Sequence, residues 1–376
     1  MDEHERTAAA LAEEALELGF DLVGLAPLAP PPDAERFRAW LADGHHADMA
    51  WLERQAERIA DPRAILPEGT CVLVVGLGHA RAAGRLEGGG RVARYALGRD
   101  YHNLVGKRLK KLVRRLGERL GAGRARTIVD AGPLLERSHA AEAGIGFRSK
   151  AANLLHHRYG PWFFLGEALV ELDGFEPPPA APAPGSCGTC TACLDACPTD
   201  AIRAPGLVDA RRCISYHTIE NRGAIPEALR ADVGEWAFGC DVCSEVCPFG
   251  HRAPDRSELW GEHPGLEGAR LADWLELDDA AARARFEGSP LRRPGALGLA
   301  RNAAVALGNA PSDTGRAALE RALDRHPSAI VRETAGWALA QGHGKDAGVR
   351  AALERALDRE PDPDARAALA RHLGRG

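Results

Sequence analysis

The sequence predicts a multidomain protein of mixed α+β or α/β class, and three observations support this. Helical and strand-like segments alternate over residues 1–173, eight of the nine cysteines lie between Cys187 and Cys247, and one ten-residue segment occurs twice near the C-terminus. The chain has 376 residues, which is more than one ordinary domain. We expect three consecutive domains: an α/β domain over 1–175, a cysteine-rich domain over 176–255 and a helical domain over 256–376.

The first domain is predicted element by element from its apolar pattern. Apolar residues at helical spacing predict a helix over 8–20, and a second helical pattern covers 35–58. Short apolar runs at 21–25 and 71–77 are typical of strands, and the second run has the pattern of a buried strand. Farther along we expect a basic helix over 101–120 and strands at 126–130, 162–165 and 168–172.

The rest of the organisation is predicted from a proline-rich connector and a repeat. Residues 176–186, EPPPAAPAPGS, contain five prolines and indicate a domain boundary. The segment RAALERALDR occurs at 316–325 and again at 350–359, a period of 34 residues. Two-helix units at this period predict a HEAT-like α-solenoid. Its other helices are expected near 296–309, 331–340 and 365–372.

Composition argues against a membrane protein and against an exported one. Hydrophobic residues make up 45% and charged residues 27% of the chain, as in globular proteins. No stretch approaches the roughly 18 apolar residues of a membrane helix, and the acidic, amphipathic start is unlike a signal peptide. We therefore expect a cytoplasmic protein with no membrane partner. The net charge of −5 excludes a uniformly basic nucleic-acid coat but allows a local basic face.

The clustered cysteines are spaced for iron–sulfur clusters. The first run reads Cys187-x2-Cys190-x2-Cys193-x3-Cys197-Pro198, and the second reads Cys213, then Cys240-x2-Cys243-x3-Cys247-Pro248. In bacterial two-cluster ferredoxins the fourth cysteine of such a run binds the other cluster. We predict two [4Fe-4S] clusters with crossed ligand sets, Cys187, Cys190, Cys193 and Cys247 for one, and Cys197, Cys213, Cys240 and Cys243 for the other. Four-cysteine zinc sites are the alternative. Cys71, in an apolar strand, is expected to be an inert core thiol.

Further segments, together with the eight cysteines, carry a resemblance to a known family. They are Arg94–His102 (RYALGRDYH), Val129–Arg137 (VDAGPLLER), Arg211–Tyr216 (RRCISY) running on to Glu220, Gly223–Glu227 (GAIPE) and Arg301–Asn309 (RNAAVALGN). The cysteine pattern alone would indicate only a ferredoxin-like protein. With these segments the chain resembles the epoxyqueuosine reductases over nearly its whole length.

The resemblance implies an enzyme of the last step of queuosine biosynthesis. Such an enzyme reduces the epoxide of epoxyqueuosine in tRNA to the cyclopentene of queuosine, with loss of water. Electrons would come from a low-potential donor of the flavodoxin or ferredoxin type and pass through the two clusters to cobalamin. Asp130 matches the family's proton donor, and we expect it at a strand end, held protonated by a dry site.

The resemblance also implies how cobalamin is held. The expected contacts are Arg54, Tyr95, Asp130, Lys150, Asn153, Ser215, Cys240 and Asp241. We expect cobalamin with its own base displaced and no protein histidine below the cobalt. The segment from Asp100 to Gly106 misses the usual cobalt-binding pattern D-x-H-x-x-G by one residue, and we interpret this as coincidence. The chain departs from many relatives at Phe147 and Ser149, where those carry Trp and Gly.

Two basic patches are candidates for binding the phosphates of tRNA. Residues 107–126 hold nine basic residues and one acid, Glu118. The second patch is expected along the helical repeats, at Arg292, Arg293, Arg301, Arg332 and Arg366. We expect the protein to act as a monomer.

Two other functions are alternatives to this one. A reductive dehalogenase-like enzyme would share the cofactors but act on a small molecule. The helical repeats, the basic patches and the lack of an export signal argue against it. A ferredoxin-like electron carrier with no chemistry of its own would leave the corrin site empty.

Overall fold

The computed structural model describes residues 3–177, 179, 181 and 183–374, so part of the predicted connector lies outside the described residues. The chain forms two compact units that are interleaved along the sequence. The first unit comprises Met1–Arg81, Asp100–Arg211 and Val242–Trp260, and the second comprises Ala82–Arg99, Arg212–Asp241 and Gly261–Gly376. The three consecutive domains stay a prediction.

The first unit is built on a four-stranded sheet in the order β1-β2-β8-β5, in which every neighbouring pair is antiparallel. Its strands are β1 (Leu22–Pro27), β2 (Cys71–Gly78), β8 (Phe163–Val170) and β5 (Ala125–Ile128). The central strand β2 is buried along its whole length, as its continuous apolar run predicts. Because no neighbouring strands in this sheet run parallel, the unit is of the α+β rather than the doubly wound α/β type.

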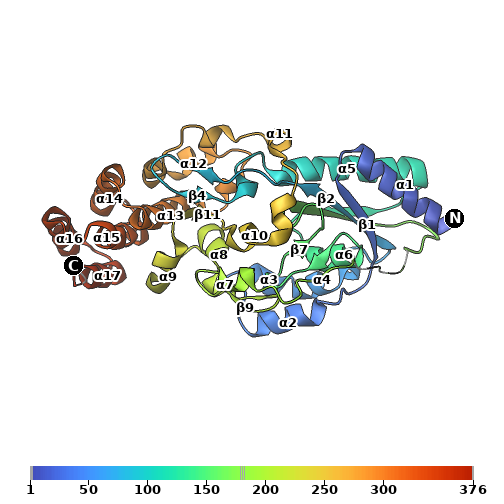
Figure 1. The fold of residues 1–376 in the computed structure, drawn as a ribbon, viewed down its shortest axis with the longest axis horizontal. Coiled ribbons are helices and arrows are strands. Elements are labelled where there is room, and N and C mark those ends of the chain that lie inside the picture. The colour runs from blue at the N-terminus through green and yellow to red at the C-terminus, as the bar shows by residue number, and fades with distance from the viewer. Residues whose placement is uncertain (1–2, 178, 180, 182, 375–376) are drawn as a thin grey trace. The chain divides into compact units, whose positions relative to one another are not determined.

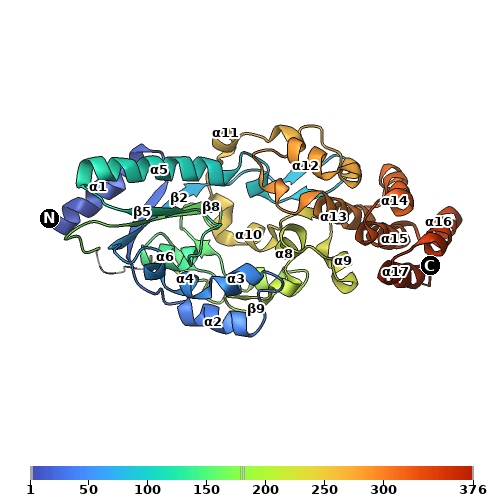
Figure 2. The same ribbon diagram turned by 180° about the vertical axis from the view of Figure 1, so that it is seen from behind.

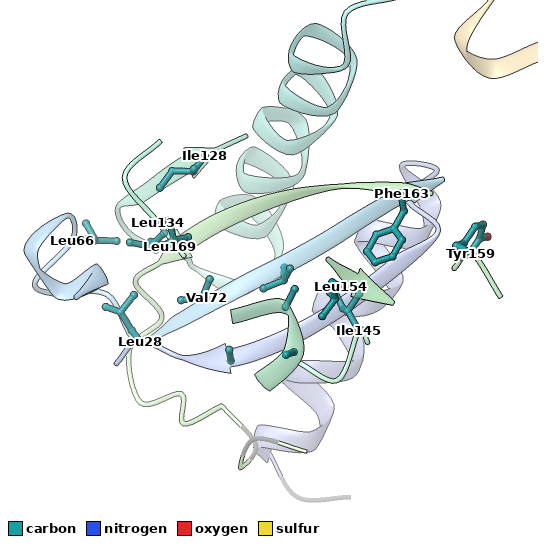
Figure 3. Close-up of a cluster of buried hydrophobic side chains, with 14 residues drawn as sticks. Leu28, Leu66, Val72, Ile128, Leu134, Ile145, Leu154, Tyr159, Phe163 and Leu169 are labelled. Carbon is teal, nitrogen blue, oxygen red and sulfur yellow. The ribbon is translucent and has the colours of Figure 1, made fainter. Parts of the chain in front are cut away.

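Helices cover both faces of this sheet (Figure 1). Helices α1 (Glu3–Glu17) and α5 (Tyr101–Leu120) lie on one face, and α6 (Glu136–Glu142) lies on the other. Between the sheet and α6 a hydrophobic cluster forms that includes Val72, Ile128, Leu134 and Leu169 (Figure 3). The remaining helices and strands of the unit are α2 (Ala34–Ala42), α3 (Ala50–Arg54), α4 (Ala56–Ala60), α7 (Ala192–Asp195), α10 (Val242–Glu245), α11 (Ser257–Trp260), β6 (Phe147–Arg148), β7 (Leu154–Leu155), β9 (Ile202–Ala204) and β10 (Leu207–Val208).

Helix α5 shows why the local predictions succeed. Its apolar residues Val105, Leu109, Leu112 and Leu116 recur every three or four positions, and all four are buried. The side chain of Asp100 caps its first turn by accepting the His102 amide. The helix ends at Leu120. The next residue, Gly121, caps it with a φ of 67°, a left-handed conformation that glycine adopts readily.

Three predicted elements differ from the structure. The single helical pattern over 35–58 is broken into α2, α3 and α4. The two strands expected at 162–165 and 168–172 form one strand, β8, because Gly166 pairs with Val75 without a break. The strand expected at 126–130 ends at Ile128, so Asp130 lies beyond it.

The second unit combines a small sheet with many helices. Its strands β3 (Gly84–Arg85), β4 (Arg91–Val92) and β11 (Trp236–Phe238) form a sheet in the order β11-β4-β3. Helices α13 to α17 occur at the five predicted positions and lie side by side in both views (Figures 1 and 2). The bounds of the helices are α8 (Ile214–Ile219), α9 (Glu227–Val233), α12 (Asp279–Arg285), α13 (Gly295–Asn309), α14 (Asp313–Arg325), α15 (Ala329–His343), α16 (Ala347–Arg359) and α17 (Pro363–Leu373).

The repeated segment forms equivalent helices in the second unit. Leu319 and Ala322 of α14 are buried, and so are Leu353 and Ala356, which stand 34 positions later in α16. Within the described part of the chain, no helix is both long enough and apolar enough to cross a membrane.

Candidate functional site

Five of the predicted cluster ligands line one pocket of the first unit. They are Cys187, Cys190, Cys193 and Cys247, which are predicted to bind one cluster, and Cys243, which is predicted to bind the other. The rest of the lining is largely apolar and includes Ala151, Leu155, Pro161, Pro248 and Phe249. Four of these thiols are the donor set that a [4Fe-4S] cluster requires, so the pocket fits such a cluster.

Local backbone geometry gathers these thiols. The Cys190 amide donates to the Cys187 carbonyl over 3.0 Å, which turns the chain between them, and Cys193 lies on the short helix α7. The segment after Cys247 packs against Gly160, where a Cβ atom would lie 2.5 Å from the Phe249 carbonyl oxygen. Glycine is therefore required at this close approach.

The thiols of the pocket influence one another's ionisation. Burial raises the pKa of Cys193, and the charge of Cys187 raises it further. Burial likewise raises the pKa of Cys247, which also interacts with Cys187 and Cys190. In the described ranges no three His, Cys, Asp or Glu side chains form a group able to hold a single metal ion.

The second predicted ligand set is divided between the two units. Cys197 and Cys243 belong to the first unit, and Cys213 and Cys240 belong to the second. The Cys197 sulfur accepts the Ala201 amide over 3.3 Å. Such N–H···S bonds stabilise a thiolate ligand and raise the potential of its cluster. The ligand set itself stays a prediction.

A tight turn carries two of the predicted cobalamin contacts. Ala152 has a φ of 60°, which is left-handed backbone in a residue other than glycine. The Lys150 ammonium donates to the carbonyls of Gly188 and Cys190 over 2.8 and 2.9 Å, and the Asn153 amide lies 3.9 Å from the Cys243 sulfur. Within the first unit these residues therefore contact the cysteine loops, and their contact with cobalamin stays a prediction.

The other predicted cobalamin contacts lie in separate places. Arg54 is exposed at the end of α3 in the first unit. In the second unit the buried carboxylate of Asp241 accepts the Arg94 amide over 2.7 Å, and the Tyr95 ring lies 6.1 Å from the Phe238 ring. Ser215 lies in α8 and Cys240 follows β11. The second unit thus brings Tyr95 and Asp241 to the same small sheet.

Asp130 occupies a strained position just beyond β5. Its φ is 56°, and its backbone N–H donates to Oε1 of Glu136 over 2.6 Å. One oxygen of its carboxylate accepts the Tyr101 hydroxyl and lies 3.6 Å from Nε2 of His102. The side chain is 61% exposed within the protein, so it is available to a ligand.

The ionisation of Asp130 differs from the expectation that a dry site keeps it protonated. Desolvation by the surrounding protein acts to raise the pKa of Asp130. The interactions of its carboxylate with His102 and Tyr101 outweigh this and hold the pKa below its usual range. Burial acts to lower the pKa of His102, and Asp100 and Asp130 together raise it to about 9. At neutral pH the proton of this group therefore resides on His102.

Sequence reasoning missed the roles of Tyr101 and His102. Nδ1 of His102 lies 2.8 Å from Asp100, the residue that caps α5, so one helix terminus orients the ring toward Asp130. The usable signal was an Asp-Tyr-His run at a helix start, which places three polar side chains within one turn. As a sequence pattern the run resembles only an imperfect cobalt-binding motif.

The basic patches are smaller than predicted. In the first unit Arg115 and Arg119 pair with glutamates of α1, among them Glu14, while Lys107, Lys110 and Lys111 are exposed. In the second unit Arg301 is completely buried and Arg332 pairs with Glu360, so neither presents a charge to RNA. Arg293 pairs with Glu220, whereas Arg292 and Arg366 are exposed.

Family models match two parts of the chain. The model described as "4Fe-4S double cluster binding domain" matches residues 186–250. The model described as "Epoxyqueuosine reductase QueG, DUF1730" matches residues 60–131, a range that ends just after Asp130.

Relatives and solved structures extend the match over most of the chain. A crystal structure of epoxyqueuosine reductase with a tRNA-Tyr epoxyqueuosine-modified stem loop has a TM-score of 0.87 at 26% identity, over 99% of both chains. A Bacillus subtilis epoxyqueuosine reductase, solved with its aspartate catalytic loop swung out of the active site, has a TM-score of 0.85 at 26% identity, over 99% of this chain and 100% of that one. The epoxyqueuosine reductase of Escherichia coli is 40% identical over 334 residues, 87% of each chain. That of Xanthomonas campestris pv. campestris is 43% identical over 347 residues, 90% of this chain and 96% of the relative. This chain belongs to the epoxyqueuosine reductase family.

Proposed function

We propose that this protein reduces epoxyqueuosine to queuosine in tRNA, removing the epoxide oxygen as water. The observation that carries the proposal is Asp130, an exposed carboxylate on strained backbone that is paired with a protonated His102. It lies in the same compact unit as the cysteine-lined pocket. Family membership and the modified tRNA stem loop held by a structural relative support the substrate.

The proposed cofactors are two [4Fe-4S] clusters and cobalamin. The cysteine-lined pocket supports Cys187, Cys190, Cys193 and Cys247 as one ligand set. Cys243, which also lines it, is proposed with Cys197, Cys213 and Cys240 for the other. Bound cobalamin, with its own base displaced and no histidine ligand, would supply reducing electrons to the substrate carbon. The residues proposed to hold it are Arg54, Tyr95, Asp130, Lys150, Asn153, Ser215, Cys240 and Asp241.

The protein's own part in the reaction is to hold and move protons. Deoxygenation of an epoxide to an alkene consumes two electrons and two protons and releases one water. When substrate covers Asp130, desolvation raises the pKa of its carboxyl, which favours transfer of the His102 proton to it. The neutral Asp130 carboxyl then donates that proton to the epoxide oxygen, and Tyr101 keeps the carboxyl oriented.

Movement of the Asp130 segment is part of the proposal. The B. subtilis relative was solved with its catalytic loop swung out of the active site, and we propose that the segment after β5 of this chain moves in the same way. Its closed position is the one in which Tyr101 and His102 contact Asp130.

We propose that helices α13 to α17 form a HEAT-like array that binds tRNA. The repeated helices α14 and α16 with equivalent buried residues support this, as do the exposed Arg292 and Arg366. Lys107, Lys110 and Lys111 of α5 are the other proposed phosphate contacts. Because the proposed substrate is tRNA, we expect the protein to act in the cytoplasm. We also propose that it is a monomer and that it receives electrons from a flavodoxin- or ferredoxin-type donor.

Substitution of Asp130 tests the proposal. Asp130→Asn removes the transferable proton but preserves the shape of the side chain, so turnover in an anaerobic assay with epoxyqueuosine-containing tRNA should fall about 100-fold or more. Iron and cobalamin content should stay unchanged. Asp173→Asn, at an exposed loop position, is the matched control and should behave like the unmodified protein.

Near-normal turnover by the loaded Asp130→Asn protein would exclude this residue as the proton donor. Reduction of a small halogenated compound, without any conversion of the tRNA, would instead favour the dehalogenase-like function.

A further inference from the structure

Two glutamates behind Asp130 form a feature that the proposed mechanism does not use. Glu136 is the first residue of α6, and Glu167 lies in the middle of β8. In the sheet Glu167 is paired with Val74 on one side and with Ile128 on the other, among residues that are otherwise apolar. A carboxyl group at the centre of such a sheet costs free energy, so its presence needs an explanation.

Glu167 is completely buried, with an exposed fraction of 0%. Among the described residues, neither of its oxygens has a hydrogen-bond partner of ordinary geometry. Burial raises its pKa well above the usual range, and the adjoining carboxylate of Glu136 raises it further. Burial and the neighbouring Glu136 thus both favour the neutral form of Glu167.

Glu136 in turn contacts the backbone of the proposed proton donor. Its Oε1 accepts the Asp130 N–H over 2.6 Å, at the residue whose φ is 56°. An aspartate in left-handed backbone persists only where its surroundings hold it there. Within the first unit this bond secures the Asp130 backbone, while Tyr101 and His102 contact only the side chain.

We propose that Glu136 holds the backbone of Asp130 in its left-handed conformation by accepting the Asp130 N–H. Glu136 is thus a positioning residue, because its side chain contacts only the backbone of Asp130. The proposal rests on the proposed function only in that Asp130 is taken as the proton donor.

The first test measures the hydrogen bond itself and needs neither substrate nor turnover. Hydrogen–deuterium exchange of the segment 129–135 is followed in the unmodified protein, in Glu136→Ala and in Glu136→Gln. Glu136→Ala removes the acceptor, so the Asp130 amide should exchange about 10-fold faster or more. Glu136→Gln keeps an amide oxygen that can accept the bond, so exchange should stay close to that of the unmodified protein.

The matched control is Glu142→Ala, which removes a carboxylate from the other end of α6. It should leave exchange in 129–135 unchanged. An unprotected Asp130 amide in the unmodified protein would overturn the proposal without any variant. Equal exchange in Glu136→Ala and the unmodified protein would also overturn it.

The second test asks whether the bond positions the proton donor. Glu136→Ala should lower kcat about 10-fold or more, with KM for tRNA and the iron and cobalamin content unchanged, and Glu136→Gln should restore most of kcat. A change in KM alone, or no rescue by Gln in a protein with normal cofactor content, would contradict a positioning role. Normal turnover by Asp130→Asn would instead refute the proposed function, while the exchange result would still stand for the bond between Glu136 and the Asp130 N–H.

Discussion

Arg301 of the second unit and Glu167 of the first are both completely buried, but their polar atoms are hydrogen-bonded to different degrees. All three guanidinium nitrogens of Arg301 donate, to the Asn302 side chain and to the carbonyls of His217, Asn221 and Gly223. Both carboxyl oxygens of Glu167 lack an ordinary partner, and the exposed Asp130 of the same unit lies on strained backbone. A buried ionisable group alone therefore does not identify a functional site. Strain and incomplete pairing indicate function, and complete pairing indicates stability.

The largest expected effect comes from removing the completely paired arginine. Arg301→Met leaves three buried carbonyl acceptors without a donor, at roughly 1–3 kcal/mol for each. We expect a loss of about 3 kcal/mol or more in the free energy of unfolding, measured by thermal or denaturant unfolding. Arg325→Met, an exposed arginine of α14, is the control and should change stability by less than about 0.5 kcal/mol. Equal stability of the two variants would contradict a stabilising role for the hydrogen bonds of Arg301.

The next largest effect is expected from the titration of His102, which contacts the proposed proton donor. His102 has a pKa raised from 6.5 to about 9, so it holds its proton through neutral pH and loses it as pH rises through about 9. Turnover should therefore fall on the alkaline side near pH 9. The stability that this ion pair adds should be fully present below about pH 6.5 and be lost over the same alkaline range.

The His102→Gln variant tests the source of that alkaline limb. It should lower turnover about 10- to 100-fold and abolish the alkaline limb near pH 9, because glutamine does not titrate. The thermal midpoint should change little. An unchanged pH–rate profile would show that His102 does not hold the proton.

The smallest effect is expected at the ninth cysteine. Burial raises the pKa of Cys71 to about 12, so its thiol should resist alkylation at pH 8 in the folded protein. Cys71→Ala should keep the full iron content and lose about 1 kcal/mol of stability. Loss of iron from this variant would place Cys71 among the ligands and contradict the division of the cysteines.

The parts of the fold that depend on local sequence were predictable. The apolar run of β2 and the apolar spacing of α5 each determine their element within a few residues. The continuity of β8 through Gly166 was not predictable, because it depends on pairing with β2, a strand distant in sequence.

The site was predictable to a similar extent. Cysteine spacing groups Cys187, Cys190 and Cys193 on one short segment. The presence of Cys243 and Cys247 at the same pocket depends on contacts with a segment distant in sequence. The conformation of Asp130, the charge of His102 and the burial of Arg301 depend on contacts between segments far apart in the chain. No pattern within one segment records such contacts.

Conversion of the modified nucleoside by the loaded protein tests the central claim most directly. Protein reconstituted without oxygen with iron–sulfur clusters and cobalamin is given a low-potential reductant and epoxyqueuosine-containing tRNA, and the nucleosides are then measured by mass spectrometry. We predict that epoxyqueuosine disappears and queuosine appears in equal amount. Unchanged epoxyqueuosine with fully loaded protein would contradict the claim.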